Sequence, residues 1–129
     1  MSVEFQESLK AAFQQYEEAK KNDEQAISWL AVNHKLLAQD VAQIVVSSIE
    51  AQEFAKDINR YFWICYICLR EGTEKVLEKA IELSLLPSRF PGQQYKEALL
   101  LAKDRIRLSN LSEAVSKNLL SALDFFIEN

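Results

Sequence analysis

Apolar residues recur every three or four positions through most of the chain, which is the spacing of amphipathic helices. The pattern predicts a first helix over about Val3–Lys21 and a second that runs to about Ile49. Between them, the short polar side chains of Asn22 and Asp23 can accept the first N–H groups of the second helix and so cap it. The residues expected to face inward are Phe5, Leu9, Ala12, Phe13 and Tyr16 in the first helix, and Ile27, Leu30, His34, Leu37, Val41, Ile44 and Val45 in the second.

A third helix, Glu53–Glu71, has the most apolar pattern and is expected to be the central, most buried element. Gly72 suits the left-handed residue that ends a helix, and Thr73 opens a fourth helix that reaches about Leu83. In the third helix the inward residues are Ile58, Tyr61, Phe62, Cys65, Ile67, Cys68 and Leu69, and in the fourth they are Val76, Leu77, Ala80 and Ile81.

The segment Leu85–Gly92 contains both prolines and is the only real break in the pattern. A fifth helix follows from Gln94 to about Leu108, and Ser109 or Asn110 caps a last helix, Leu111–Glu128. Tyr95, Ala98, Leu99, Ala102 and Ile106 are expected inward in the fifth helix, and Leu111, Val115, Leu119, Ala122, Leu123 and Phe126 in the last. The sequence thus predicts one all-α domain over residues 1–129, with six helices and one irregular corner.

Composition supports a self-sufficient helical domain. The 129 residues are 49% hydrophobic and include only two glycines and two prolines, whereas sheets and long loops use both at turns. The net charge is −4, and lysine and arginine are scattered among acidic residues rather than gathered on a stripe. Nucleic-acid binding is therefore disfavoured.

The N-terminal sequence, the longest apolar stretch and the cysteines predict the cellular location of the protein. The N-terminus has no basic region followed by an apolar core, so it does not resemble a secretory signal. The longest apolar stretch, Tyr61–Leu69, is far too short for a transmembrane span. Two cysteines without an export signal indicate a reducing cytoplasm.

Few residues offer catalytic or metal chemistry. Cys65 and Cys68 lie on one helix face, but zinc needs two more soft ligands, and a redox pair needs a helix N-terminus that lowers a thiol pKa. We therefore predict two buried thiols and no metal site. His34, the sole histidine, has no partner in the sequence that would complete a catalytic relay, and we expect a hydrogen-bonded boundary residue.

Aromatic residues are unusually dense in the third helix. Tyr61, Phe62, Trp63 and Tyr66 cannot all face one way, so some are core and others are exposed. Exposed members would mark a partner surface or the wall of a planar-ligand site, and Trp63 and Tyr66 are the predicted interface residues.

The resemblance to a known family rests on five segments, residues 56–62, 69–73, 82–88, 95–99 and 123–126. In this order they resemble segments of the phycobiliproteins, the globin-fold pigment carriers of cyanobacteria. Residues 56–62 (KDINRYF) and 69–73 (LREGT) resemble the family's central helix and the turn after it. Residues 82–88 (ELSLLPS) resemble its Leu-Ser-Pro-Ser corner, and residues 95–99 (YKEAL) resemble the helix that follows. Residues 123–126 (LDFF) are similar to its last helix, so the resemblance covers Glu53 to the C-terminus. It implies a globin-like, phycocyanin-like fold.

The chain also departs from that family. Phe54 stands where the bilin-linking cysteine would be, and a phenylalanine has no nucleophile, so the resemblance implies no covalent bilin at this position. The loop before the central helix is cut to a few residues, and the N-terminal helical pair used for subunit pairing is missing. No histidine lies between Thr73 and Leu85 to ligate haem. The shorter relatives called bilin-biosynthesis-associated globins resemble this chain more than antenna subunits do.

The resemblance implies a non-enzymatic protein of bilin metabolism or of the phycobilisome, in a photosynthetic, cyanobacterium-like cell. A bilin would bind non-covalently, with Asp57 accepting pyrrole N–H bonds, Lys56 pairing a propionate and Tyr61 beside them. The alternative is a degenerate globin without a ligand that dimerises, or binds another phycobiliprotein-like subunit, through Trp63 and Tyr66. A bilin lyase or isomerase is a third reading, disfavoured because the sequence places no acid–base pair.

Overall fold

A computed structural model describes residues 3–71 and 75–128, apart from the side chains of residues 16 and 19. These residues form five helices and contain no strand, which confirms the all-α prediction. The helices are α1 (Val3–Val45), α2 (Ala51–Glu71), α3 (Lys75–Glu82), α4 (Gly92–Arg107) and α5 (Glu113–Glu128). Within the described ranges, no helix combines the length and the apolar character needed to cross a membrane.

The prediction of two separate helices before Ile49 is wrong, because α1 passes through Asn22 and Asp23 without a break. Asp23 does not cap a helix. Its Oδ1 accepts a hydrogen bond from Asn118 Nδ2 of α5 at 2.7 Å. Partial burial raises the pKa of Asp23, an effect that this bond opposes. A short polar side chain that bonds to another helix no longer competes for the hydrogen bonds of its own backbone. The remaining free-energy cost of such a residue inside a helix is modest.

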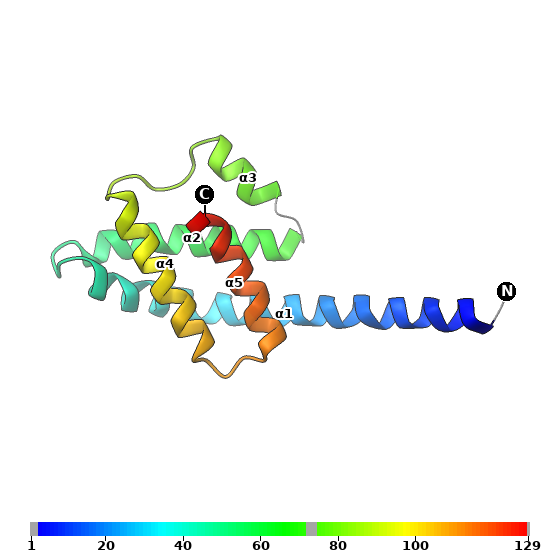
Figure 1. Ribbon diagram of the computed structural model, residues 1–129. Helices are drawn as coiled ribbons and strands as arrows, with labels where there is room; N and C mark the ends of the chain where they lie inside the picture. The colour runs from blue at the N-terminus through cyan, green and yellow to red at the C-terminus, as the bar shows by residue number, and fades with distance from the viewer. Residues whose placement is uncertain (1–2, 72–74, 129) are drawn as a thin grey trace.

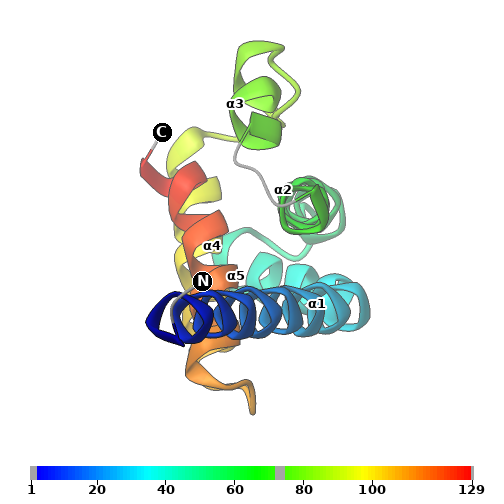
Figure 2. The ribbon, with the colours of Figure 1, turned by 90° about the vertical axis from the view of Figure 1, so that its right-hand side faces the viewer.

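The helices are arranged around α2. The second half of α1 and α2 lie side by side and run in opposite directions, while α4 and α5 cross them (Figure 1). In both views α2 lies between α1 on one side and α3 on the other (Figures 1 and 2). The first part of α1 extends beyond the other helices (Figure 1). The central position predicted for the third helix is therefore confirmed.

The core follows the predicted stripes most closely in α4 and α5. All five residues predicted inward in α4 are buried, as are five of the six in the last helix. In α2 the buried residues are Phe54, Ala55, Asp57, Ile58, Tyr61, Phe62, Ile64, Cys65 and Cys68. The inward prediction for the first part of α1 is wrong, because no other helix covers it: Phe5, Leu9, Ala12 and Phe13 are exposed, and the side chain of Tyr16 lies outside the described ones. Two further residues predicted inward point outward, Ile44 with 56% of its surface exposed and Ile81 with 38%. Both lie in the last turns of their helices, where neighbouring elements no longer cover the stripe.

The helix ends differ in part from the predictions. The cap of α5 is neither Ser109 nor Asn110 but Ser112, whose Oγ accepts the Val115 N–H at 3.3 Å. The Ser109 hydroxyl instead donates to the Ile106 carbonyl at 2.6 Å. The predicted helix end at Gly72 and the cap at Thr73 lie outside the described residues.

The end of α3 turns the chain into the segment of residues 83–91. Ser84 has a left-handed φ of 55°, and the Leu85 N–H donates to the Ala80 carbonyl at 2.9 Å. This bonding pattern closes a helix with a Schellman-type turn. The segment then crosses toward the start of α4 (Figure 1) and covers the site described next.

Candidate functional site

Asp57 is the only charged side chain that is buried in the described part of the chain, with 6% of its surface exposed. Its Oδ2 accepts a hydrogen bond from Tyr95 Oη at 2.7 Å and another from Arg89 Nε at 3.3 Å. Its Oδ1 accepts a bond from Arg89 Nη2. A buried carboxylate is stable only when charge and hydrogen bonds compensate its lost hydration, and these partners supply both.

Arg89, in the 83–91 segment, supplies the positive charge that compensates Asp57 of α2. Its Nη1 also donates to Glu53 Oε2 at 2.8 Å. The hydrogen bonds that Arg89 donates to Asp57 and Glu53 raise the pKa of Arg89. Bonds from Lys56 and then Arg89 hold the pKa of Glu53 below its usual value. Two carboxylates one helical turn apart thus hold one guanidinium.

Tyr95 ties the same network to α4. Its hydroxyl donates to Asp57 and accepts the Phe90 N–H at 3.1 Å. Burial, with the bond to Asp57 as a further cause, raises the pKa of Tyr95, so the phenol stays protonated and able to donate. The 83–91 segment is therefore fastened at Arg89 by charge and at Phe90 by a backbone bond.

An aromatic cluster surrounds this network. Phe54 lies parallel to Tyr95, with ring centroids 5.4 Å apart, and meets Phe90 edge-on at 5.0 Å. Tyr61 packs against Tyr95 at 5.6 Å and edge-on against Phe126 at 5.1 Å. Such pairs contribute beyond their buried area and hold ring planes in fixed orientations.

A cavity of about 630 Å³ lies beside these rings, beneath the 83–91 segment. Its walls come from α2, the segment, α4 and α5, and it has the size and mixed apolar and polar lining of small-molecule sites. Burial raises the pKa of Tyr61 to about 12, with smaller effects from Tyr95 and Asp57. The lining residues are Tyr61, Ser84, Leu86, Pro87, Ser88, Phe90, Gly92, Tyr95, Lys96, Leu99 and Phe126.

The structure brings two of the three predicted ligand residues together. Asp57 and Tyr61 both adjoin Tyr95, which lines the cavity. Lys56 instead lines a second hollow of about 510 Å³ between α1 and α2, and its Nζ lies 3.1 Å from Glu53 Oε1. Lys56 and Asp57 therefore do not share a pocket.

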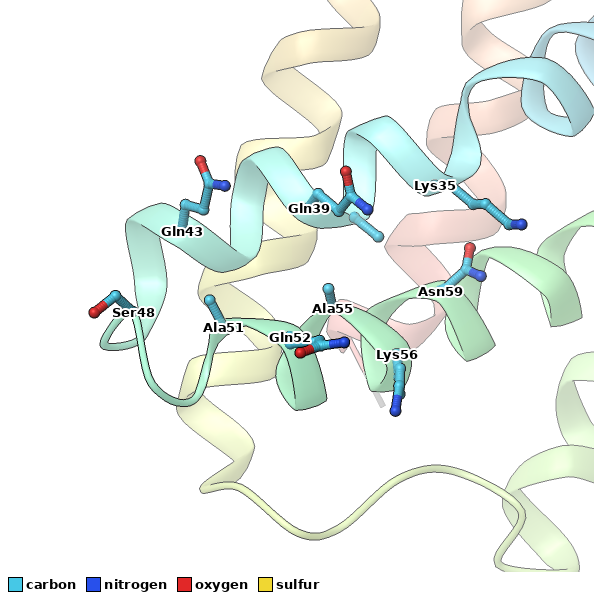
Figure 3. Close-up of a pocket in the computed structure, with 10 residues that line it drawn as sticks. Lys35, Gln39, Gln43, Ser48, Ala51, Gln52, Ala55, Lys56 and Asn59 are labelled. Atoms are coloured by element: carbon cyan, nitrogen blue, oxygen red, sulfur yellow. The ribbon is translucent and has the colours of Figure 1, made fainter.

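The second hollow is lined mostly by residues with polar side chains. Figure 3 shows Lys35, Gln39 and Gln43 on α1 across from Gln52 and Asn59 on α2. His34 is half-buried, and its Nδ1 lies 2.5 Å from Asn59 Oδ1, so it is the hydrogen-bonded boundary residue that the sequence predicts. Amide and ammonium groups at an open surface can be satisfied by water, and this hollow lacks the aromatic walls of the cavity.

The two predicted interface residues differ in exposure. Trp63 has 62% of its surface exposed, whereas Tyr66 is half-buried and packs against the core. Of these two residues, only Trp63 is therefore available as a large aromatic contact for a partner.

Cys65 and Cys68 are buried, as predicted. The pKa of the Cys65 thiol is raised, mainly by burial and to a lesser extent by the neighbouring Cys68. Because the thiolate is the reactive form, we expect iodoacetamide at pH 8 to modify Cys65 in the native protein about a hundredfold or more slowly than in urea. Peptide mapping by mass spectrometry measures both rates. Native modification at the unfolded rate would show that α2 is not packed as described.

The sequence matches no protein-family model and no curated protein. Arg89 is the site residue that sequence reasoning missed. Its one signal was its position in the only irregular segment of the chain, where a lone cation near buried helices invites a search for an acidic partner. Tyr95 was predicted as a core residue, but its hydroxyl contacts were not foreseen.

Proposed function

We propose that this chain is a non-enzymatic, phycobiliprotein-related protein of globin-like fold that binds an open-chain tetrapyrrole, a bilin, non-covalently in the aromatic cavity. The observation that carries the proposal is the cavity of about 630 Å³ walled by Tyr61, Phe90, Tyr95 and Phe126. Flat, conjugated ligands are favoured where fixed aromatic rings bury their faces. The resemblance of residues 53–129 to phycobiliproteins supports a bilin among such ligands.

Polar groups near the cavity suit the ends and the centre of a bilin, which carries two propionates and several pyrrole N–H groups. Lys96 lines the cavity, and Arg89 lies between two lining residues, Ser88 and Phe90. In the proposed complex, pyrrole N–H groups replace Arg89 on Asp57. The released guanidinium then joins Lys96 at the propionates, so each charge keeps a partner.

The binding mode is non-covalent for a chemical reason. Phe54 is fully buried and offers no nucleophile, and Cys65 is about three helical turns further along α2. We place such a protein in the cytoplasm of a cyanobacterium-like cell, beside bilin metabolism or the light-harvesting antenna.

Titration with biliverdin or phycocyanobilin tests the proposal. We expect a red-shifted absorbance band and quenched tryptophan fluorescence on binding. Lys96→Glu should weaken binding about three- to tenfold, because it places a carboxylate opposite a propionate. Lys117→Glu makes the same charge change on an exposed site outside the cavity and should leave affinity unchanged. Unaltered absorbance with either bilin, or equal effects of the two variants, would contradict the proposal.

The exposed Trp63 favours a second candidate function, a ligand-free interaction module that binds a copy of itself or another phycobiliprotein-like subunit. Exposed tryptophans are frequent centres of binding energy at interfaces. A ligand-free oligomer that Trp63→Ala dissociates, in a protein that binds no bilin, would support this candidate over the first.

A further inference from the structure

The 83–91 segment is attached to the rest of the chain at few points. Of the backbone groups from Leu86 to Phe90, only the Phe90 N–H has a hydrogen-bond partner in the described part of the chain, the Tyr95 hydroxyl at 3.1 Å. The side chains of Leu86 and Phe90 are half-buried against the core. Segments with few backbone hydrogen bonds and few buried side chains open at a lower free-energy cost than core helices. The segment can therefore move while α2 and α4 stay folded.

Arg89 makes the ionic part of this attachment at the protein surface. Its side chain is 54% exposed, and so is half of Glu53, at 50%. Ion pairs that water and salt can reach are individually weak, so this attachment opens readily. Once Arg89 leaves, Asp57 keeps the hydrogen bond from Tyr95, which belongs to α4 and not to the segment. The buried carboxylate therefore retains a partner, which lowers the free-energy cost of opening.

The segment forms one wall of the aromatic cavity. The lining residues that it supplies are Ser84, Leu86, Pro87, Ser88 and Phe90, and the other walls belong to α2, α4 and α5. Arg89 lies between two of these residues and bonds to both oxygens of Asp57, whose surface is almost fully buried. A ligand group can therefore reach Asp57 only after Arg89 has moved.

The ends of the segment suit such a movement. At its start, Ser84 has a φ of 55° in the Schellman-type turn that closes α3, so the chain changes direction there. At its end, α4 begins at Gly92. Between these points the chain runs from α3 to α4 without a helical turn (Figure 1). Hinges occur at such element ends, where a few residues absorb the change in φ and ψ.

We infer that residues 85–90 form a lid over the aromatic cavity, and that Arg89 is the latch that holds this lid on Asp57 and Glu53. The lid opens when Arg89 leaves the two carboxylates, and it turns about its ends at Ser84 and Gly92. Because the latch is ionic and accessible to water, salt favours the open lid. That a bilin enters by this route rests on the proposed function, whereas the lid and its latch do not.

The Phe90 amide reports whether the lid is open, because its hydrogen bond joins the lid to α4. We expect hydrogen exchange at Phe90, followed by NMR in the full chain, to be about tenfold or more faster in Arg89→Gln than in the unmodified protein. The Leu99 amide, inside α4, should exchange at an unchanged rate. Arg70→Gln is the matched control, because it removes a similarly exposed arginine that pairs within α2 alone, and it should change neither rate.

Salt provides a second measurement on the same amide. Raising sodium chloride from about 0.05 to about 1 M should accelerate exchange at Phe90 about threefold or more in the unmodified protein, because the ions screen the latch. The same change should have little effect in Arg89→Gln, which has no ionic latch left to screen.

The rate of bilin association tests whether the lid controls entry. Glu53→Gln weakens the latch from outside the cavity lining, so it should raise both the association and the dissociation rate constants of phycocyanobilin about threefold in stopped-flow absorbance. A fixed wall would leave association unchanged. Glu82→Gln is the control for electrostatic attraction of the anionic bilin, because it removes the same charge from an exposed position beside the segment, and it should change neither rate constant.

Three results would overturn the lid. They are unchanged exchange at Phe90 in Arg89→Gln, an equal response to salt in the two proteins, and equal acceleration at Phe90 and Leu99 in both Arg89→Gln and Glu53→Gln, which would mean that only global unfolding exposes the amide. An association rate constant that Glu53→Gln leaves unchanged would overturn control of entry. If phycocyanobilin does not bind, the proposed function fails, while the exchange rates still confirm or overturn the lid and its latch.

Discussion

Phe54→Ala is expected to lower the free energy of unfolding by about 3–5 kcal/mol, the usual cost of removing a buried phenylalanine ring. Phe54 has none of its surface exposed, and its ring is stacked on Tyr95 and meets Phe90 edge-on. Its loss would leave a void where α2, α4 and the 83–91 segment meet. Urea denaturation followed by circular dichroism measures the change.

The exposed first part of α1 offers a matched control for this substitution. Phe13→Ala removes the same ring from a side chain that is 62% exposed, and it should cost less than about 0.5 kcal/mol. Comparable losses from the two variants would mean that Phe54 does not occupy the packed position described.

Asp57→Asn is expected to lower the free energy of unfolding by about 2–4 kcal/mol. The carboxylate accepts three hydrogen bonds, from Tyr95 and from two nitrogens of Arg89. An amide of the same shape keeps one acceptor oxygen but turns an N–H₂ group toward donors, which leaves buried polar groups without partners. The 83–91 segment should also become more susceptible to proteolysis near Arg89, because only one of the two carboxylates that hold this guanidinium, Glu53, keeps its charge.

Asp104→Asn is the control for charge removal in itself. Asp104 accepts a hydrogen bond from Arg107 at 3.0 Å, but its side chain is 64% exposed. A solvent-exposed pair contributes little, so the expected change is below about 0.5 kcal/mol. If Asp57→Asn were as mild as this control, the buried network would not hold the segment in place.

Prediction from the sequence was most successful where apolar spacing is regular. The stripes of α4 and α5 were found almost residue by residue, because a helix that covers a core on one face must repeat its apolar residues at the helical period. The central position of α2 was foreseen for the related reason that an element with little polar face must be surrounded. Helix ends were less certain, since Ser109, Asn110 and Ser112 all have side chains that can cap.

The false break at Asn22 and Asp23 shows what local chemistry cannot reveal. Both residues favour helix starts when their side chains have only the nearby backbone to bind. Here the Asp23 side chain accepts a hydrogen bond from Asn118, which lies far along the chain, and the backbone at Asp23 remains helical. The described residues therefore form five helices rather than the six predicted.

The candidate site, like the fold, could be predicted only in part. Asp57 and Tyr61 were identified as site residues, and they do adjoin one another through Tyr95. Lys56 directly precedes Asp57 in the sequence, yet it lines a different hollow, because adjacent residues on a helix point about 100° apart. Arg89 could not be assigned, since its partner is set by how the 83–91 segment lies over α2.

Taken by itself, the sequence determined that this protein is all-helical and which faces of α2, α4 and α5 are buried. These properties follow from periodicity and from the chemistry of single side chains. Only the tertiary structure decided that Arg89 and Tyr95 bind Asp57 and that a cavity lies beside them. It also decided that the apolar residues in the first part of α1, such as Leu9 and Phe13, are exposed. Such features depend on contacts between residues far apart in the chain, and those contacts exist only once the helices have packed.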